Sequence, residues 1–198
     1  RAIRYAGCGR MIARGFGISV LWGVCVYALV VFMPVHLQKA LGVSDRDAFI
    51  AALAGNIILV GMCFVSGGLA DRIGRRRLMT GAALALLLLS PPLMALLVAR
   101  HDLLPLVLVQ CCFSALVGLY SGAVPAVLAG LFPTAVRSTA TSIAYNGALT
   151  IFAGFAPAII TALSATRLGA QAPTLYVSAA AIVALAAILT FPSDDLGR

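Results

Sequence analysis

Between two long apolar runs the sequence reads Gly67-Gly68-Leu69-Ala70-Asp71-Arg72-Ile73-Gly74-Arg75-Arg76-Arg77. Gly74 permits a tight turn because glycine has no side chain to restrict the backbone. Arginines in a short connection between apolar runs are typical of the cytoplasmic side of a membrane. Asp71 lies beside this positive cluster and is expected to stay ionised, because nearby opposite charge favours the carboxylate. The stretch therefore predicts two membrane-spanning helices joined by a cytoplasmic turn.

The composition supports a membrane protein. Of the 198 residues, 62% are hydrophobic and only 10% are charged, whereas a soluble domain is roughly half apolar and a quarter charged. So few charges cannot cover the surface of a water-soluble fold, and so much apolar surface excludes intrinsic disorder. We therefore expect an all-α, polytopic membrane protein.

The apolar residues form six runs, each long enough to cross ~30 Å of hydrocarbon as a helix. Gly118 and Gly122 are four residues apart, a spacing that lets two membrane helices approach closely. The predicted spans are residues 17–38, 48–70, 78–99, 103–131, 139–163 and 174–192.

The charges predict the orientation. There are 14 Lys and Arg against 6 Asp and Glu, a net charge of +8. Most basic residues lie in the N-terminal arm, in the turn at residues 72–77, at Arg137 and at the C-terminus, whereas the other side has Lys39, Arg46, Arg100 and Arg167. The excess places both termini in the cytoplasm, which an even number of spans also requires. No aromatic-interleaved basic patch points to nucleic acid.

The sequence predicts a protein without catalytic or cofactor chemistry. No group of His, Cys, Asp and Glu has metal-ligand spacing, and no nucleophilic triad or phosphate-binding loop appears. The five cysteines form no CxxC pair. We therefore expect neither an enzyme, nor a metal site, nor a bound cofactor.

Four segments carry a resemblance to a known family. Residues 67–77 resemble the loop signature of the major facilitator superfamily, and Leu131-Phe132-Pro133-Thr134-Ala135-Val136-Arg137 resembles the signature between its tenth and eleventh helices. Two further segments are similar to the metabolite:proton symporters of that superfamily. The first is the end of the first run, Tyr27 with Phe32-Met33-Pro34-Val35-His36-Leu37-Gln38, and the second is Ser142-Ile143-Ala144-Tyr145-Asn146 with Gly154-Phe155-Ala156-Pro157.

The resemblance implies helices seven to twelve of a twelve-helix transporter, built as two inverted three-helix repeats. Such a protein moves a small organic acid or zwitterion, for example a carboxylate or betaine, with a proton by alternating access. Its partners are the solute, the lipid bilayer and an N-terminal six-helix half, and its location is the bacterial inner membrane. Two alternatives stay open: a sugar-porter-type half, which the chain's tail at Phe191–Asp195 disfavours, and a truncated, non-functional membrane fragment.

The resemblance also implies a cytoplasmic gate. Asp71 would dock on a helix of the other half, and Arg137 with the start of the fifth span would receive the equivalent loop of that half. The family usually has Glu three residues before the proline of the second signature, where this chain has Gly130, so a weaker inward gate is expected. The predicted gating residues are Gly67, Asp71, Arg72, Gly74, Arg75, Arg76 and Arg137.

Solute contacts are expected from uncharged side chains. No run has an ionised residue at its middle, so the proton-binding carboxylate and any arginine that grips an anionic solute are expected in the other half. The candidates that remain are Tyr27, Asn56, Gln110, Tyr120 and Asn146. For each of them an interhelical hydrogen bond is the alternative role. Trp22 is expected to pack or to lie at the membrane interface, and His36 and His101 are expected to be solvated near the outer surface.

Overall fold

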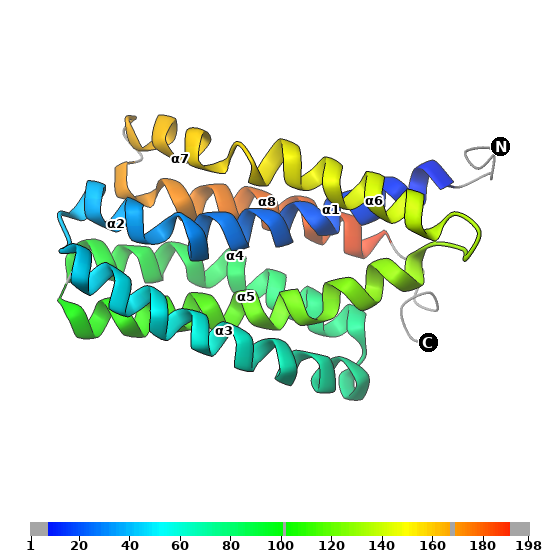
Figure 1. Ribbon diagram of the computed structural model, residues 1–198, viewed down its shortest axis with the longest axis horizontal. Coiled ribbons are helices and arrows are strands. Elements are labelled where there is room, and N and C mark those ends of the chain that lie inside the picture. Colours follow the sequence, from blue (N-terminus) through cyan, green and yellow to red (C-terminus); the bar gives the residue numbers. More distant parts are fainter. Residues whose placement is uncertain (1–7, 101, 167–168, 191–198) are drawn as a thin grey trace.

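A computed structural model of the chain describes residues 8–100, 102–166 and 169–190. It is a bundle of six helices that are long and apolar enough to cross a membrane (Figure 1). The elements are α1 (Cys8–Cys25), the π-helix η2 (Val26–Val31), α2 (Met33–Leu41), α3 (Asp45–Ile73), α4 (Arg75–Ala99), α5 (Leu103–Leu131), α6 (Arg137–Ala148), the π-helix η3 (Leu149–Ala153), α7 (Ala156–Ser164), the 3-10 helix η4 (Gly169–Gln171) and α8 (Ala172–Leu189).

Several helices extend past the apolar runs at their charged ends. The first span begins at Cys8 rather than residue 17, and α3 continues to Ile73. Gly67 therefore lies inside α3, which corrects its placement in a loop, and residues 75–77 form the first turn of α4. The reason is that a helix emerging into water keeps its backbone bonds while its charged side chains are solvated, so hydropathy marks the lipid boundary rather than the helix end.

Consecutive spans run antiparallel. The beginning of α1, the α3–α4 turn, the α5–α6 connection and the end of α8 lie at one end of the bundle (Figure 1). We call it the basic end because it has Arg10, Arg14, Arg72, Arg75, Arg76, Arg77 and Arg137; the opposite end has Lys39, Arg46 and Arg100. The triplet α1, α3, α4 starts at the basic end and the triplet of α5, α6–α7, α8 starts at the opposite end, so the triplets have inverted orientation.

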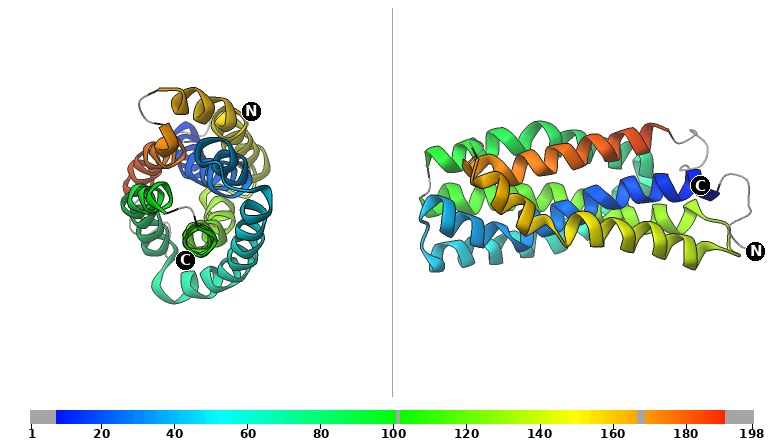
Figure 2. Two further views of the ribbon diagram at one scale, coloured as in Figure 1. Left: turned by 90° about the vertical axis from the view of Figure 1, so that its left-hand side faces the viewer. Right: turned by 90° about the horizontal axis from the view of Figure 1, so that it is seen from above.

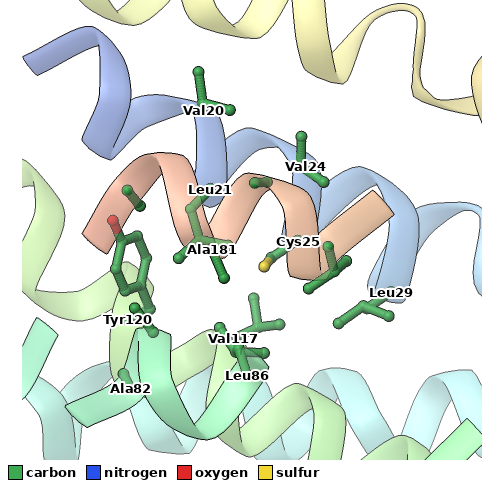
Figure 3. Packing of buried hydrophobic residues seen from close by; sticks show 14 of the residues in the cluster. Val20, Leu21, Val24, Cys25, Leu29, Ala82, Leu86, Val117, Tyr120 and Ala181 are labelled. Atoms are coloured by element: carbon green, nitrogen blue, oxygen red, sulfur yellow. The ribbon is translucent and has the colours of Figure 1, made fainter. Parts of the chain in front are cut away.

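Helices α1 and α5 lie in the middle of the bundle. Seen along its axis, α4 and α8 pack on one side of them, and α6–α7 and α3 lie on the other (Figure 2). The core between them is apolar and closely packed (Figure 3). It includes Val20, Leu21, Val24, Cys25 and Leu29 of α1 and η2, Ala82 and Leu86 of α4, Val117 and Tyr120 of α5, and Ala181 of α8.

Glycines bring α3 and α5 into close contact. A Cβ atom added to Gly118 would lie 2.9 Å from the carbonyl oxygen of Leu59, and one added to Gly122 would lie 2.6 Å from the carbonyl oxygen of Cys63. Real Cβ atoms do not approach backbone oxygens so closely. The small-residue spacing read from the sequence is thus used for helix packing, in the way that membrane helices use it.

Two spans share a local irregularity. In the first, the N–H of Phe32 donates to the carbonyl of Tyr27 (2.8 Å), and in the fifth, the N–H of Gly154 donates to that of Leu149 (2.7 Å). Each π-helical turn is followed by Phe-x-Pro, with Pro34 near the start of α2 and Pro157 near the start of α7. Because proline has no N–H, it interrupts the hydrogen-bond ladder and ends the preceding helix.

Candidate functional site

The turn at the basic end consists of one residue. Gly74 has φ +90° and ψ 136°, a conformation that residues with a side chain rarely adopt. Its N–H donates to the carbonyl of Ala70 (3.1 Å), and its own carbonyl accepts from the N–H of Leu78 (3.1 Å). A single glycine therefore joins the two helices of the predicted gate, so that only a few residues of the chain separate Asp71 from the arginines at the start of α4.

Most of the charges at this turn oppose the helix dipoles, although Arg72 in the last turn of α3 agrees with its helix. Asp71 lies in the last turn of α3, where the dipole favours a cation, and the three arginines at residues 75–77 lie in the first turn of α4, where it favours an anion. Both placements weaken the helices that carry them. Helix stability does not explain these charges, which leaves membrane orientation and contacts outside this bundle.

The gating residues have different surroundings. Asp71 and Arg72 are exposed, and within the described chain Asp71 has no ion pair. Arg76 is half-buried and donates to the carbonyl of Leu189 (3.4 Å), while Arg14 donates to the carbonyl of Thr190. Two arginines thus cap the C-terminal end of α8, where cations are stabilising.

Arg137 belongs to a pocket at the basic end. The cavity measures about 490 Å³ and lies between α1, α5 and α6. It is lined by Trp22, Pro125, Leu128, Ala129, Arg137, Ser138, Thr141, Ser142 and Tyr145. The Nε–H of Arg137 donates to the carbonyl of Phe132 (3.3 Å). We call this cavity the Arg137 pocket.

The polar wall of the Arg137 pocket comes from one helix face. Ser138, Thr141, Ser142 and Tyr145 follow the i, i+3, i+4, i+7 spacing that places side chains together on a helix. The ring of Tyr145 lies against Trp22, with centroids 5.0 Å apart. The sequence did not predict this constellation, and Trp22 was expected to pack or to lie at the membrane interface. The detectable signal was a polar stripe at helical spacing in an otherwise apolar span.

Two of the residues predicted to contact solute instead form hydrogen bonds between helices of the bundle. The side-chain amide of Gln110 donates to the carbonyl of Leu29 (2.9 Å), and the hydroxyl of Tyr120 donates to that of Ile18 (3.1 Å). Both side chains are buried, so the geometry matches the alternative role of an interhelical hydrogen bond. Tyr27, Asn56 and Asn146 are exposed on η2, α3 and α6, and none of the three lines the Arg137 pocket.

His36 differs from its expectation at the opposite end. It was expected to be solvated, but only 4% of it is exposed, and its Nε2 lies 3.0 Å from the carbonyl oxygen of Ala170. It lines a cavity of about 340 Å³ between α2, α7 and η4. Packing of α2 against η4 buries the ring, and hydropathy does not reveal such packing. His101 lies outside the described residues.

The sequence profile of the Major Facilitator Superfamily matches residues 10–157. The chain belongs to this superfamily. It is similar to the citrate-proton symporter of Salmonella typhi, with 32% identity over 90% of this chain and 41% of the relative. The citrate-proton symporter of Klebsiella pneumoniae is 29% identical over 90% of this chain and 40% of that protein.

Other relatives are named for different solutes. The proline/betaine transporter of Escherichia coli (strain K12) is 27% identical over 89% of this chain and 35% of that protein. The chain therefore spans about two fifths of the length of these curated relatives. The six apolar helices and the family membership make it an integral, multi-pass membrane protein.

Proposed function

We propose that this chain is the C-terminal six-helix half of a transporter that carries a small organic acid or zwitterion with a proton by alternating access. The observation that carries the proposal is the match to superfamily members named as citrate-proton symporters and proline/betaine transporters, of which it covers 35–41%. The inverted triplets and the polar, arginine-containing pocket at the basic end are compatible with such a half. The proton-binding carboxylate belongs to the other half in this proposal.

The basic end is assigned to the cytoplasm of a bacterial inner membrane, because arginines are retained on that side. Both ends of the described chain then lie near the cytoplasmic surface. A cysteine in place of exposed Arg77 tests the orientation. An impermeant thiol reagent should label it from the cytoplasmic side of membrane vesicles, and labelling from the outer side would reverse the assignment.

The gate follows from the same orientation. Asp71 is exposed, unpaired within the described part of the chain and at an unfavourable helix end, so its carboxylate is available to the N-terminal half. The turn is held at the interface with the N-terminal half by Arg72, Gly74 and Arg75. Arg137 contacts the equivalent loop of that half. Nothing lies within 4 Å of a Cβ added to Gly130, so a side chain has room at this position. The glutamate that the family usually has there is absent, and we therefore expect a weaker inward gate.

The function is tested with the complete transporter that contains this chain, reconstituted in proteoliposomes. A proton gradient should drive accumulation of citrate, proline or glycine betaine, and an uncoupler should abolish that accumulation. Uptake that is indifferent to the gradient would contradict proton coupling. No uptake of any of the three solutes would contradict the proposed solute class.

A further inference from the structure

The Arg137 pocket has the size and lining of a small-molecule site. Its volume of about 490 Å³ falls within the roughly 300–1,000 Å³ typical of ligand pockets. Apolar residues of α5 form one wall, and the Trp22–Tyr145 pair forms another. Such sites combine apolar walls with a few convergent polar groups that orient the ligand, and here the polar groups come from α6.

The charge of the pocket is uncompensated. Arg137 is the sole charged side chain among the described lining residues. Its Nε is bonded to the carbonyl of Phe132, and within the described chain its two terminal nitrogens have no partner. The bond at Nε fixes one edge of the guanidinium, so the remaining N–H groups form the planar fork that matches a carboxylate.

Hydroxyl groups surround this cation. Among the lining residues, Ser138 and Ser142 are exposed and Thr141 is half-buried. The Oγ1 atom of Thr141 is buried and has no hydrogen-bond partner in the described residues. An atom that is covered so fully does not face the cavity, so the hydroxyl groups available to a ligand are those of the exposed Ser138 and Ser142. A carboxylate ligand, with acceptors only, complements a cation and a row of hydroxyl donors.

A second cavity at the same end lacks this chemistry. It measures about 470 Å³ and has Arg10 and Arg14 beside Ala13, Ala186 and Ala187. Arg14 is bonded to the end of α8, and Thr190 is the single hydroxyl-bearing residue among the lining residues described. The presence of arginine in a cavity at the basic end is thus not sufficient to make that cavity a carboxylate site. The combination of a guanidinium fork, a hydroxyl row and an aromatic wall distinguishes the Arg137 pocket from this second cavity.

We propose that the Arg137 pocket is a binding station for the carboxylate group of the solute at the inner mouth of the transport pathway. This inference rests on the proposed function and extends it, because it assigns a charged solute contact to a half whose spans have no ion at their middle. The solute occupies the pocket while the inner gate is open. The loop of the other half takes its place when the gate closes.

The test measures local protection rather than transport. Ser138→Cys is introduced into the complete transporter in inside-out membrane vesicles without a proton gradient, and its labelling by a small thiol reagent is timed, with the unsubstituted protein as background for native cysteines. At ten times its half-protecting concentration, citrate, succinate or glycine betaine should slow labelling about tenfold. The uncharged trimethyl ester of citrate should give no protection.

Matched variants assign the effect to Arg137. Ala13→Cys in the second cavity should be labelled at the same rate with and without the carboxylates. In the Ser138→Cys background, Arg137→Gln should abolish protection, Arg137→Lys should weaken it, and Arg10→Gln should leave it unchanged. Each variant is first checked for membrane insertion, and Arg137→Lys keeps the test decisive if the glutamine variant is not inserted.

Two results overturn the inference. One is the absence of protection by all three carboxylates, and the other is equal protection in the parent and Arg137→Gln proteins. Uptake by the proteoliposomes with no protection at Ser138→Cys would refute the station and leave the proposed function standing. Protection without gradient-driven uptake would support the binding station and contradict the proposed proton-coupled transport.

Discussion

The side-chain amide of Gln110 on α5 donates a hydrogen bond of 2.9 Å to the carbonyl oxygen of Leu29 in the π-helical turn of the first span. A π-helix pairs the carbonyl of residue i with the N–H of residue i+5, which for Leu29 is Pro34, and proline has no N–H. Gln110 replaces the missing donor. In a bilayer, where no water can satisfy a backbone carbonyl, this bond compensates for the irregular turn.

Gln110→Ala should therefore lower stability by about 1 kcal/mol, within the range measured for hydrogen bonds between membrane helices. The half-unfolding temperature of the purified transporter reports the loss, and the KM for solute should not change. Ser178→Ala is the matched control, because the Ser178 hydroxyl is buried without a partner and its removal should cost nothing. A raised KM with unchanged stability would instead make Gln110 a solute contact.

Gly74→Ala should destabilise the turn between α3 and α4. The φ of +90° and ψ of 136° force an alanine into a sparsely populated backbone region that costs roughly 1–3 kcal/mol, although no atom lies within 4 Å of the new methyl group. Gly81→Ala in α4 also meets nothing within 4 Å, and there alanine should be neutral or stabilising. Thermal unfolding of the two variants separates backbone strain from added volume, and equal melting temperatures would disprove the strain.

Gly122→Ala should separate α3 from α5. The new methyl group would meet the carbonyl oxygen of Cys63 and the Cβ of Ser66, both at 2.6 Å, and overpacking of this kind costs typically ~1–3 kcal/mol. Gly61→Ala, on α3 but with nothing within 4 Å, should be tolerated. Expression level and melting temperature in detergent are the readouts. Wild-type values for Gly122→Ala would show that the helices adjust without cost.

The sequence was sufficient for the architecture because lipid imposes a simple rule. Every span must satisfy its backbone internally and present apolar side chains, so six runs predict six helices. The same logic failed at the helix ends. The predicted second span ended at residue 70, where the charges begin, whereas α3 continues to Ile73, since charge is compatible with a helix once it leaves the bilayer.

The candidate site was harder to predict from the sequence, because the role of each polar side chain depends on which residues it contacts across the bundle. The sequence made Gln110 a candidate for solute binding. In the structure its side-chain amide instead donates to the Leu29 carbonyl, which lacks a backbone donor because of Pro34 and the π-helical turn. The stripe on α6 had the right period, but its importance depends on Trp22 and Arg137 closing a pocket around it. The exposed Asp71 keeps its predicted gating role as a hypothesis.

Asp71→Asn should reduce transport at least about tenfold, because removing one partner of a charge-assisted hydrogen bond costs roughly 1.5–3 kcal/mol. Insertion and orientation should be unaffected, since the arginines of the turn remain. Asp102→Asn at the opposite end is the matched control, as this residue makes no side-chain cap hydrogen bond with α5. Initial uptake rates in proteoliposomes measure the effect, and wild-type rates in Asp71→Asn would remove Asp71 from the gate.

His36 should make stability at the opposite end depend on pH. Burial lowers the pKa of its imidazole below the ordinary 6.5, and the hydrogen bond to the Ala170 carbonyl opposes this shift. Lys39 also lines the cavity; the described lining residues from α7 and η4 have no charge. The neutral ring is therefore the form that packs between α2 and η4.

The sign of the pH dependence follows from linkage. Between the lowered pKa and about 6.5 the unfolded state binds more protons than the folded state, so the free energy of unfolding rises with pH in this window. The contribution of His36 is complete above about pH 6.5 and is lost as the pH falls through the folded pKa. His36→Gln keeps a donor for the Ala170 carbonyl but cannot titrate. Its melting temperature should fall less steeply than that of the parent on acidification below pH 6.5, and parallel pH profiles for the two proteins would show that the buried ring does not control this end of the bundle.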